Sequence, residues 1–443
     1  MNPKPHTAGQ AALQIVKKLR SNGHVALLAG GCVRDMLLNR TPKDYDVATD
    51  AIPARVQELF PQARLVGAKF GVVLIRKSGF DTEVATFRSD GPYSDGRHPD
   101  AVTFGTEIED ARRRDFTING LFLDPLDDRV IDYVGGRDDL TAGVIRTIGD
   151  PDHRFSEDHL RMLRAVRLAA RLGFTIEPHT ASAIERLAPN LKAISPERIW
   201  QELEEILTAP TRAAGWSLLV QLGLVDHLAS GLRVDRRPDS AIQRRLAALS
   251  DEPIDPALAL AASLCDDGVD AAKDVCRALR LSNRLTQAVV WLVRSLPMLR
   301  PESDLELADF KFLMAEPNWP HLLELLRVDL TAADTPASRS TGGLLGGGAD
   351  SSVLPGGQAA PTQWAAANAN LTPYESVRRR AEAIDSADVA PPPLLSGDDL
   401  AAMGMPPGPR FGEILKTIYR AQLNTKITTR EEAITLAGEL MKS

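Results

Sequence analysis

The sequence has few cysteines and no long apolar run. Its three cysteines, Cys32, Cys265 and Cys276, are odd in number and scattered. This pattern excludes a disulfide framework and a zinc site, and it fits a reducing compartment. No stretch reaches the roughly 18 apolar residues that a membrane helix needs, and the first 20 residues hold no apolar signal segment. We therefore expect a cytoplasmic protein that makes no membrane contact.

The sequence also lacks an excess of positive charge. Its 52 lysines and arginines are outnumbered by 59 acidic residues, which gives a net charge of −7. A general polyanion-binding protein is thereby excluded, so any contact with nucleic acid must be made by a local patch. The length of 443 residues predicts about two to four domains, and the hydrophobic content of 44% supports a sizeable core.

The order of strand and helix signals predicts an α+β protein. A helix is expected over residues 11–22, where apolar residues recur at helical spacing. Short β-like runs separated by glycine or proline follow at residues 24–30, 45–49, 71–77, 82–88 and 118–124. From about residue 150 helical periodicity takes over.

A glycine-rich segment interrupts the helical part. Residues 335–361 hold seven glycines and three prolines with only two charges. This composition cannot bury a core, so it predicts a flexible linker. A second helical region runs from about residue 372 to residue 443.

The stretch "LLAGGCVRD" (27–35) places Gly30 and Gly31 between a strand and a short helix. Two glycines there let a phosphate approach backbone N–H groups, and Arg34 is one turn further to meet its charge. An isolated glycine pair is more often only a turn. The stretch matches neither the P-loop nor the G-x-G-x-x-G pattern of dinucleotide sites.

Three carboxylates form the next pattern. Asp44 and Asp46 stand two apart on a predicted strand, so both are expected on the same side of it. Adjacent oxygen ligands of this kind hold Mg²⁺ together with substrate phosphates. Glu83, central on a later strand, would complete a two-metal site for phosphoryl transfer. The alternative is a solvent-facing acidic pair on an edge strand.

The stretch "EDHLRMLRAVR" (157–167) carries a ladder of arginines. Arg161, Arg164, Arg167 and Arg171 occupy an arc of roughly 120° on a helical wheel, opposite an apolar arc. Asp158 stands one turn before them, and no acidic residue follows any of them at i+4. A solubilising surface helix is the alternative. A carboxylate beside a guanidinium can imitate a Watson–Crick edge, accepting C and A while rejecting G and U.

Three long stretches carry a family resemblance. "GGCVRDMLLNRTPKDYDVATD", "RRRDFTINGLFLDP" and "RFSEDHLRMLRAVRLAARLGF" resemble successive motifs of the class II tRNA nucleotidyltransferase / bacterial poly(A) polymerase family. The match extends from residue 24 to about 205 and resumes at residues 395–415. The resemblance implies a polymerase-β-like nucleotidyltransferase head with a small mixed sheet, followed by an all-helical neck, body and tail. The expected divisions are a head at 1–150, a neck at 151–215, a body at 216–334, a linker at 335–370 and a tail at 371–443.

The resemblance also implies a role for each matching residue. Asp44 and Asp46 would hold the metal ions, with Glu83 as a third catalytic carboxylate. The neck pair Asp158 and Arg161 would read the base. The remaining nucleotide-binding residues would be Gly30, Gly31, Arg34, Arg114, Asp115, Asn119, Arg164 and Arg167.

The implied reaction is template-independent addition of C, C and A to tRNA 3′ ends. CTP and ATP would be the substrates, Mg²⁺ the cofactor and pyrophosphate the product, and no stable protein partner is implied. An A-adding enzyme or a poly(A) polymerase of the same family is the alternative. Such poly(A) polymerases often carry a long basic C-terminal extension, whereas this sequence ends "REEAITLAGELMKS"; we therefore expect poly(A) synthesis to be disfavoured, while addition of A alone stays open. A non-catalytic RNA-binding relative would be expected to have lost Asp44, Asp46 or Asp158.

Three further segments carry expectations. Residues 86–104 resemble the flexible loop that adjusts the pocket from C to A, and they carry Arg88, Asp90, Asp95 and Arg97. Residues 259–270 resemble an HD phosphohydrolase segment, but Cys265 stands where a histidine ligand would be, which predicts packing helices instead. In the tail, "GDDLAAMG" and "GPRFGEIL" predict two helices joined by a glycine-rich turn that could meet RNA phosphates.

Overall fold

The computed structural model describes residues 7–67, 71–93, 96, 99–229, 232, 240–250, 254–300, 303–333, 372–406 and 408–442. These residues divide into two compact units that separate near residue 236, and residues 278–280 belong with the first. The predicted linker at 335–370 lies outside the described residues. Among those described, no helix is long and apolar enough to cross a bilayer.

The first unit contains a mixed seven-stranded sheet in the order β3-β4-β5-β2-β1-β8-β9. The β2–β5 pair is parallel, and the other neighbouring pairs are antiparallel. In that order the strands are Arg64–Gly67, Val72–Lys77, Phe80–Thr86, Asp46–Thr49, Ala26–Ala29, Phe122–Asp124 and Arg129–Ile131.

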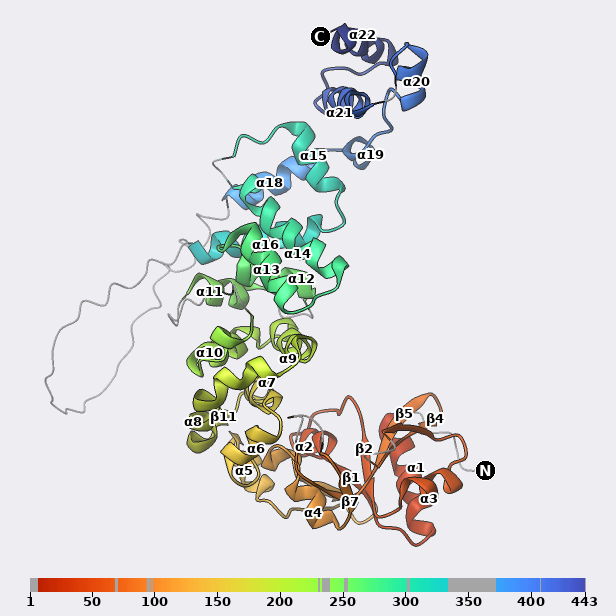
Figure 1. Cartoon of the computed structure of the whole chain (residues 1–443), viewed down its shortest axis with the longest axis vertical. Coiled ribbons are helices and arrows are strands. Elements are labelled where there is room, and N and C mark those ends of the chain that lie inside the picture. Colours follow the sequence, from red (N-terminus) through yellow and green to blue (C-terminus); the bar gives the residue numbers. More distant parts are fainter. Residues whose placement is uncertain are drawn as a thin grey trace, which may run out of the picture. The chain divides into compact units, whose positions relative to one another are not determined.

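Helices cover the sheet unequally (Figure 1). Helix α1 (Ala8–Ser21) packs on β1, β2 and β5 and buries Ile15, Val16 and Leu19, with α3 (Pro53–Leu59) beside it. On the other face of the sheet, side chains of β1, β2 and β8 form a buried cluster with Ala111 of α4 (Glu107–Arg112). The cluster consists of Leu27, Ala29, Ala48, Phe87, Ala111 and Phe122.

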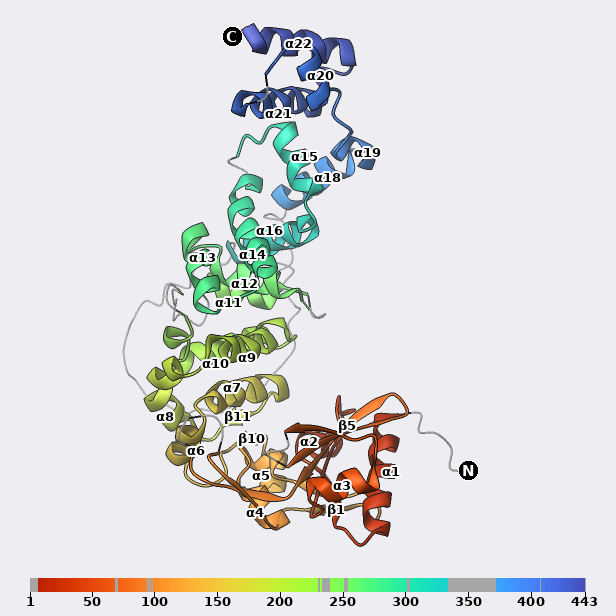
Figure 2. The same ribbon diagram turned by 45° about the vertical axis from the view of Figure 1, so that its right-hand side comes forward.

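The helical end of the first unit stacks α7 (Leu160–Leu172) on α9 (Pro196–Thr208) and α10 (Arg212–Gln221), as Figure 2 shows. This packing requires a glycine at residue 215, because a Cβ there would lie 2.5 Å from Cγ2 of Ile206. The remaining elements are α2 (Gly31–Leu37), α5 (Gly136–Ala142), α6 (Pro151–Glu157), α8 (Pro178–Leu187) and the short strands β10 (Val144–Ile145) and β11 (Thr175–Ile176).

The second unit is helical. Helix α12 (Pro256–Leu264) is buried along its whole length, and α20 (Gly397–Ala402) and α21 (Pro409–Leu423) are the two helices predicted in the tail. The others are α11 (Ala241–Ala248), α13 (Gly268–Ala278), α14 (Asn283–Ser295), α15 (Leu307–Ala315), α16 (Trp319–Ala333), α18 (Thr372–Glu382), α19 (Ser386–Val389) and α22 (Arg430–Lys442).

Four of the five predicted strands coincide with β1, β2, β4 and β5. The strand predicted over 118–124 is wrong in its first half, because residues 117–119 form a 3-10 turn (η2, Thr117–Asn119) and the strand begins at Phe122. The predicted loop at 86–104 contains a hairpin of β6 (Arg88–Asp90) and β7 (Val102–Phe104). Asp95 and Arg97 of that loop lie outside the described residues.

Candidate active site

Two carboxylates meet on neighbouring strands. Asp46 is the first residue of β2, and the parallel register that pairs Val47 with Val84 places it beside Glu83 of β5. Burial, the Glu83 charge and, more weakly, Asp44 raise the pKa of Asp46 to about 6, although Arg114 opposes the shift. The prediction that Asp44 lies on the strand is wrong, because β2 begins only at Asp46 and Asp44 is exposed in the preceding turn.

These carboxylates suit a divalent cation. Asp46, Glu83 and Asp44 offer oxygen ligands, the type that Mg²⁺ prefers. Burial and the neighbouring carboxylates together outweigh Arg114 in raising the pKa of Asp46. A bound cation would add positive charge beside Asp46 and keep it ionised.

A tight turn forms the next part of the site. Gly30 ends β1 with φ +75°, a conformation that favours glycine. A Cβ at Gly30 would lie 2.7 Å from Nη1 of Arg114. In α2, Arg34 is only 5% exposed and donates hydrogen bonds to Asp35 and, at 2.7 Å, to Oδ1 of Asn119.

On the opposite side of the site, carboxylates hold the arginine side chains in position. Asp110 accepts hydrogen bonds from Arg113 and Arg114 and so fixes both guanidinium groups. Asp115 accepts from Asn119 at 3.1 Å and pairs with Arg164 at 2.7 Å. Burial alone would raise the pKa of Asp115, but Arg164 and Asn119 hold it well below its usual range.

The predicted arginine helix is present as α7, but Asp158 is not part of it. Asp158 is extended (φ −154°, ψ 104°) at the junction of α6 and α7. Its Oδ1 accepts from the Leu160 N–H at 3.1 Å, and its Oδ2 accepts from Arg198 at 2.7 Å. Arg161 bonds instead to Glu157 and to the Arg154 carbonyl. The joint action of Asp158 and Arg161 on a base therefore stays a prediction.

The ladder arginines are paired, although the absence of acidic residues at i+4 suggested that they would be free. Arg161 pairs with Glu157, which stands four residues before it. The other partners come from distant elements: Arg164–Asp115 at 2.7 Å, Arg167–Glu202 at 2.6 Å and Arg171–Asp35 at 3.6 Å. Glu157 was visible in the same motif, whereas the other three partners are far apart in sequence and gave no local signal.

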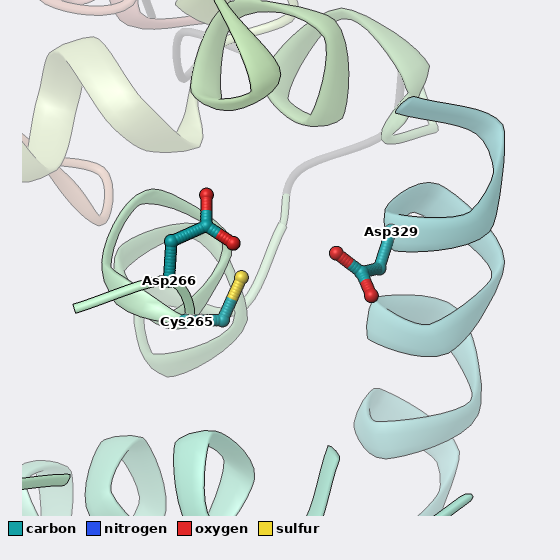
Figure 3. Close-up of side chains that lie close together, drawn as sticks. All are labelled: Cys265, Asp266 and Asp329. Carbon is teal, nitrogen blue, oxygen red and sulfur yellow. The ribbon is translucent and has the colours of Figure 1, made fainter. Parts of the chain in front are cut away.

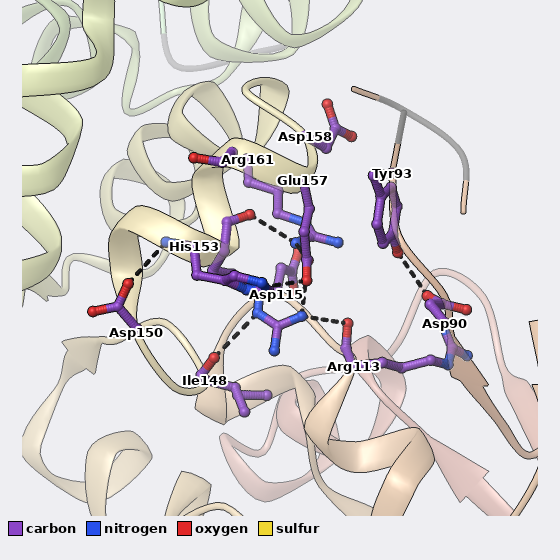
Figure 4. Close-up of polar contacts among 12 residues, drawn as sticks. Asp90, Tyr93, Arg113, Asp115, Ile148, Asp150, His153, Glu157, Asp158 and Arg161 are labelled. Atoms are coloured by element: carbon purple, nitrogen blue, oxygen red, sulfur yellow. Dashed lines mark hydrogen bonds and ion pairs between the residues drawn. The ribbon is translucent and has the colours of Figure 1, made fainter. Parts of the chain in front are cut away.

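The described part of the 86–104 loop reaches the ladder (Figure 4). Asp90 accepts from Arg88 at 2.9 Å and from Oη of Tyr93 at 2.7 Å. The Arg161 guanidinium lies 5.8 Å from the centre of the Tyr93 ring. Burial and the contact with Asp90 raise the pKa of Tyr93 to about 12, so the phenol stays protonated at neutral pH. Tyr93 was not predicted from the sequence.

These groups surround one cavity of about 620 Å³. Every predicted site residue lines it except Asp44 and Glu83. The lining consists of Gly30, Gly31, Arg34, Asp46, Val72, Arg88, Asp90, Tyr93, Pro99, Arg113, Arg114, Asp115, Asn119, Asp158, Arg161, Arg164, Arg167, Leu168 and Arg171. Its size, and its arginines beside carboxylates, suit a nucleoside triphosphate with a metal ion.

Comparison with known proteins identifies the family. Residues 26–146 match the family described as the poly A polymerase head domain, and residues 173–235 match a probable RNA and SrmB-binding site of polymerase A. The CCA-adding enzyme of Geobacillus stearothermophilus is 34% identical over 435 residues, covering 96% of this chain and 95% of that protein. The chain belongs to the family of CCA-adding enzymes and bacterial poly(A) polymerases.

Other members of this CCA-adding and poly(A) polymerase family are also similar to this chain. The crystal structure of the Bacillus stearothermophilus CCA-adding enzyme in complex with CTP matches with a TM-score of 0.73 and 29% identity, covering 99% of this chain and 98% of that one. Poly(A) polymerase I of Escherichia coli O157:H7 is 43% identical over 231 residues, which is 49% of each chain. The predicted family, its α+β head with a helical remainder and its nucleotidyltransferase class are confirmed. Nucleotidyltransferases of this family depend on a metal ion.

A second acidic cluster lies in the helical unit (Figure 3). Cys265, Asp266 and Asp329 have ligand atoms within 4.8 Å of one another. Arg245 donates to both carboxylates, and Arg300 donates to Asp329 at 2.9 Å. Burial raises the pKa of the Cys265 thiol to about 12, so it stays protonated. The guanidinium groups neutralise this cluster, and it fits a metal ion less well than Asp46 and Glu83 do.

Proposed function

We propose that this chain adds C, C and A to tRNA 3′ ends, using CTP and ATP and releasing pyrophosphate. One observation carries the proposal: the similarity to a CCA-adding enzyme extends over nearly the whole of both chains, whereas the similarity to poly(A) polymerase I covers about half of each. The cavity supports it, because it combines cationic and carboxylate side chains in a space of nucleotide size.

In this proposal the first half of the cavity holds the triphosphate. Gly30 and Gly31 let the phosphates approach the backbone, and Arg34 and Arg114 neutralise them. Asp46 and Glu83, with Asp44 beside them, would hold Mg²⁺, which would stabilise the charge that develops on the transferred phosphate. The buried Asp115 and Asn119 keep Arg164 and Arg34 in position.

The helical half of the cavity reads the base. Asp158 accepts from the exocyclic amine of cytosine or adenine, and Arg161 donates to a ring nitrogen or carbonyl acceptor. For this, the Asp158 carboxylate exchanges Arg198 for the base, and Arg161 loosens its contact with Glu157. Arg164 and Arg167 lie behind the pair, close to base and phosphates.

The proposed division of labour follows the expected domains. The head at 1–150 performs the chemistry, the neck at 151–215 reads the base, and the tail at 371–443 anchors the tRNA beyond the helical body. The cytoplasm, where uncharged tRNA and nucleoside triphosphates occur together, is the proposed location.

Addition of A alone, or of a poly(A) tract, is the second candidate. It rests on the 43% identity to poly(A) polymerase I over 231 residues, and a CCA-adding enzyme of Geobacillus thermodenitrificans is 44% identical over a similar stretch of 220 residues. The cavity chemistry is the same for both products, so the product must be measured.

The deciding experiment gives purified protein and Mg²⁺ two labelled tRNAs, one ending at the discriminator base and one already carrying CC. Each receives CTP, ATP or both, and the products are resolved to single nucleotides. Addition of CCA to the first tRNA establishes the proposal. Extension of only the second by one A identifies an A-adding enzyme, and long A tracts identify a poly(A) polymerase. No product from either tRNA would overturn transferase activity.

A further inference from the structure

The order of strands in the sheet places the functional groups in a line. Gly30 follows Ala29 of β1, Ala29 pairs with Asp46 of β2, and Asp46 lies beside Glu83 of β5. On the next strands, Leu74 of β4 pairs with Glu83, and Arg64 of β3 pairs with Leu74. Directly paired residues point to the same face of a sheet. One row of residues therefore runs from the turn at Gly30 past Asp46 and Glu83 to Arg64.

Only one end of this row can take the nucleotide. The groups proposed for the triphosphate, Gly30, Arg34 and Arg114, all lie at the β1 end. In phosphoryl transfer the attacking and leaving oxygens lie roughly in line on opposite sides of the phosphorus. If pyrophosphate leaves toward β1, the attacking 3′-hydroxyl must approach across Asp46 and Glu83 from the β4 side.

Among the described residues, the groups on that side of the sheet stay accessible. The face carrying Asp46 is covered over β1, β2 and β8 by the cluster around Phe122, whereas on β5 Glu83 is exposed. On β4, Val72 and Leu74 are half-buried, while Val73 and Ile75, which point to the α1 side, are buried. Val72 already lines the nucleotide cavity, so this surface is continuous with it.

Charge on this surface suits the backbone of an RNA strand. Arg64 is exposed at the edge strand. Arg76, two residues beyond Leu74, keeps a side-chain exposure of 66% and lies 3.7 Å from Asp81. Single-stranded nucleic acid binds to positively charged grooves that follow its backbone, and here the arginines flank aliphatic side chains on which a ribose or base can pack.

We propose that this surface, the acceptor face formed by Arg64, Val72, Leu74, Arg76 and Ala85, binds the 3′-terminal nucleotides of the RNA that is being extended. Leu74, directly across from Glu83, supports the terminal nucleotide so that its 3′-hydroxyl lies beside Asp46 and Glu83. Arg64 and Arg76 contact the preceding phosphates, and Arg76 exchanges Asp81 for a phosphate. This inference rests on the proposed transferase function and identifies where its second substrate lies.

The test compares Arg64→Ala, Arg76→Ala and the double variant with Arg55→Ala. Arg55 lies on α3 at the opposite side of the sheet, where it pairs with Glu58, and serves as the matched control. Steady-state kinetics are measured with CC-ended tRNA and ATP, varying each in turn. Each single variant is expected to raise KM for tRNA roughly three- to tenfold, because a phosphate contact is lost, and to leave KM for ATP within about twofold.

Salt dependence gives a second readout that a folding defect would not reproduce. Each lost phosphate contact to single-stranded RNA lowers the slope of log affinity against log salt concentration by about 0.7. The double variant should therefore bind tRNA with a slope reduced by about 1.4, while Arg55→Ala keeps the wild-type slope. Arg76→Lys, which retains the charge, should recover most of the loss.

The outcomes separate this inference from the proposed function. If the wild type extends neither tRNA, the proposed function itself fails. If the wild type extends tRNA but the double variant matches Arg55→Ala in KM and salt slope, the acceptor face is wrong and the function stands. An equal rise in KM for ATP and tRNA would also overturn it, because the residues would then act on the nucleotide site.

Discussion

Asp115 illustrates how single carboxylates organise the site. It is buried, pairs with Arg164 at 2.7 Å and accepts from the Phe116 N–H at 2.8 Å. We expect Asp115→Asn to lower the free energy of unfolding by about 2 kcal/mol at pH 7, a value reduced because Arg164 is partly exposed. Asp152→Asn, which removes an exposed pair with Arg186, is the control and should cost less than about 0.5 kcal/mol.

The effect of Asp115 should depend on pH in a defined direction. Its pKa in the folded state lies below the ordinary value near 4, so the stabilisation is complete above about pH 4. It is lost only as the pH falls toward the lower folded pKa. Thermal unfolding of wild type and Asp115→Asn should therefore differ by a constant amount from pH 5 to 8 and converge in acid. A difference that grows below pH 4 would contradict the assignment.

The carboxylates beside the turn at Gly30 are the proposed metal ligands, and their substitution tests that role. Asp46→Asn is expected to lower nucleotide incorporation by about 1,000-fold or more, because it removes a charged metal ligand, and Asp44→Ala should also abolish activity. Affinity for tRNA, measured by filter binding, should change little in either variant. Asp50→Asn, an exposed residue just after β2, is the control. Retained turnover in Asp46→Asn would disprove the metal assignment.

At the scale of elements, the geometry of the turn between β1 and α2 leads to a separate prediction. Gly30→Ala adds a Cβ 2.7 Å from Arg114 at a φ of +75°, so it should displace that guanidinium and raise KM for CTP and ATP. Gly79→Ala has a φ of +90° but nothing within 4 Å, and it should cost only about 1 kcal/mol of stability. Equal KM values in the two variants would show that Arg114 does not meet the nucleotide.

Elements with strong periodicity were predictable from the sequence, and short or context-dependent ones were not. Burial of the apolar arc of α7 and of the β-branched residues in β4 and β5 stabilises these elements, so the sequence pattern alone predicts them. Strands β3 and β9, of four and three residues, exist only because a neighbour pairs with them. Asp44 was assigned to a strand because the alternation of side chains does not reveal where pairing begins.

The contacts of the arginine ladder were beyond local sequence reasoning. Arg164 and Asp115 are 49 residues apart, and Arg167 and Glu202 are 35 apart. The motif predicted a cationic helix face correctly, but its four counterions come from four separate segments of the chain. The residue types of the site could therefore be predicted from the sequence. The ion pairs that neutralise its arginines could not, because only the fold brings their acidic partners close.

At the scale of the whole molecule, removal of metal should separate activity from stability. EDTA is expected to abolish incorporation, because the proposed mechanism needs a metal ion held by Asp46 and Glu83. It should leave the Tm unchanged within about 1 °C, because Arg245 and Arg300 already neutralise Asp266 and Asp329. Differential scanning fluorimetry with and without Mg²⁺ or Zn²⁺ measures this. A Tm drop of several degrees that Zn²⁺ reverses would show that the Cys265 cluster holds a metal.

The ion pairs of the ladder arginines also have a consequence for product release. Arg161, Arg164, Arg167 and Arg171 each have a carboxylate within 4 Å. In the proposed reaction these carboxylates would pair again with any ladder guanidinium that had contacted the nucleotide, so the emptied cavity would hold no cluster of unpaired ladder arginines. Such internal counterions would lower the affinity of the emptied cavity for a polyanionic product, which would suit repeated turnover by a chain of net negative charge.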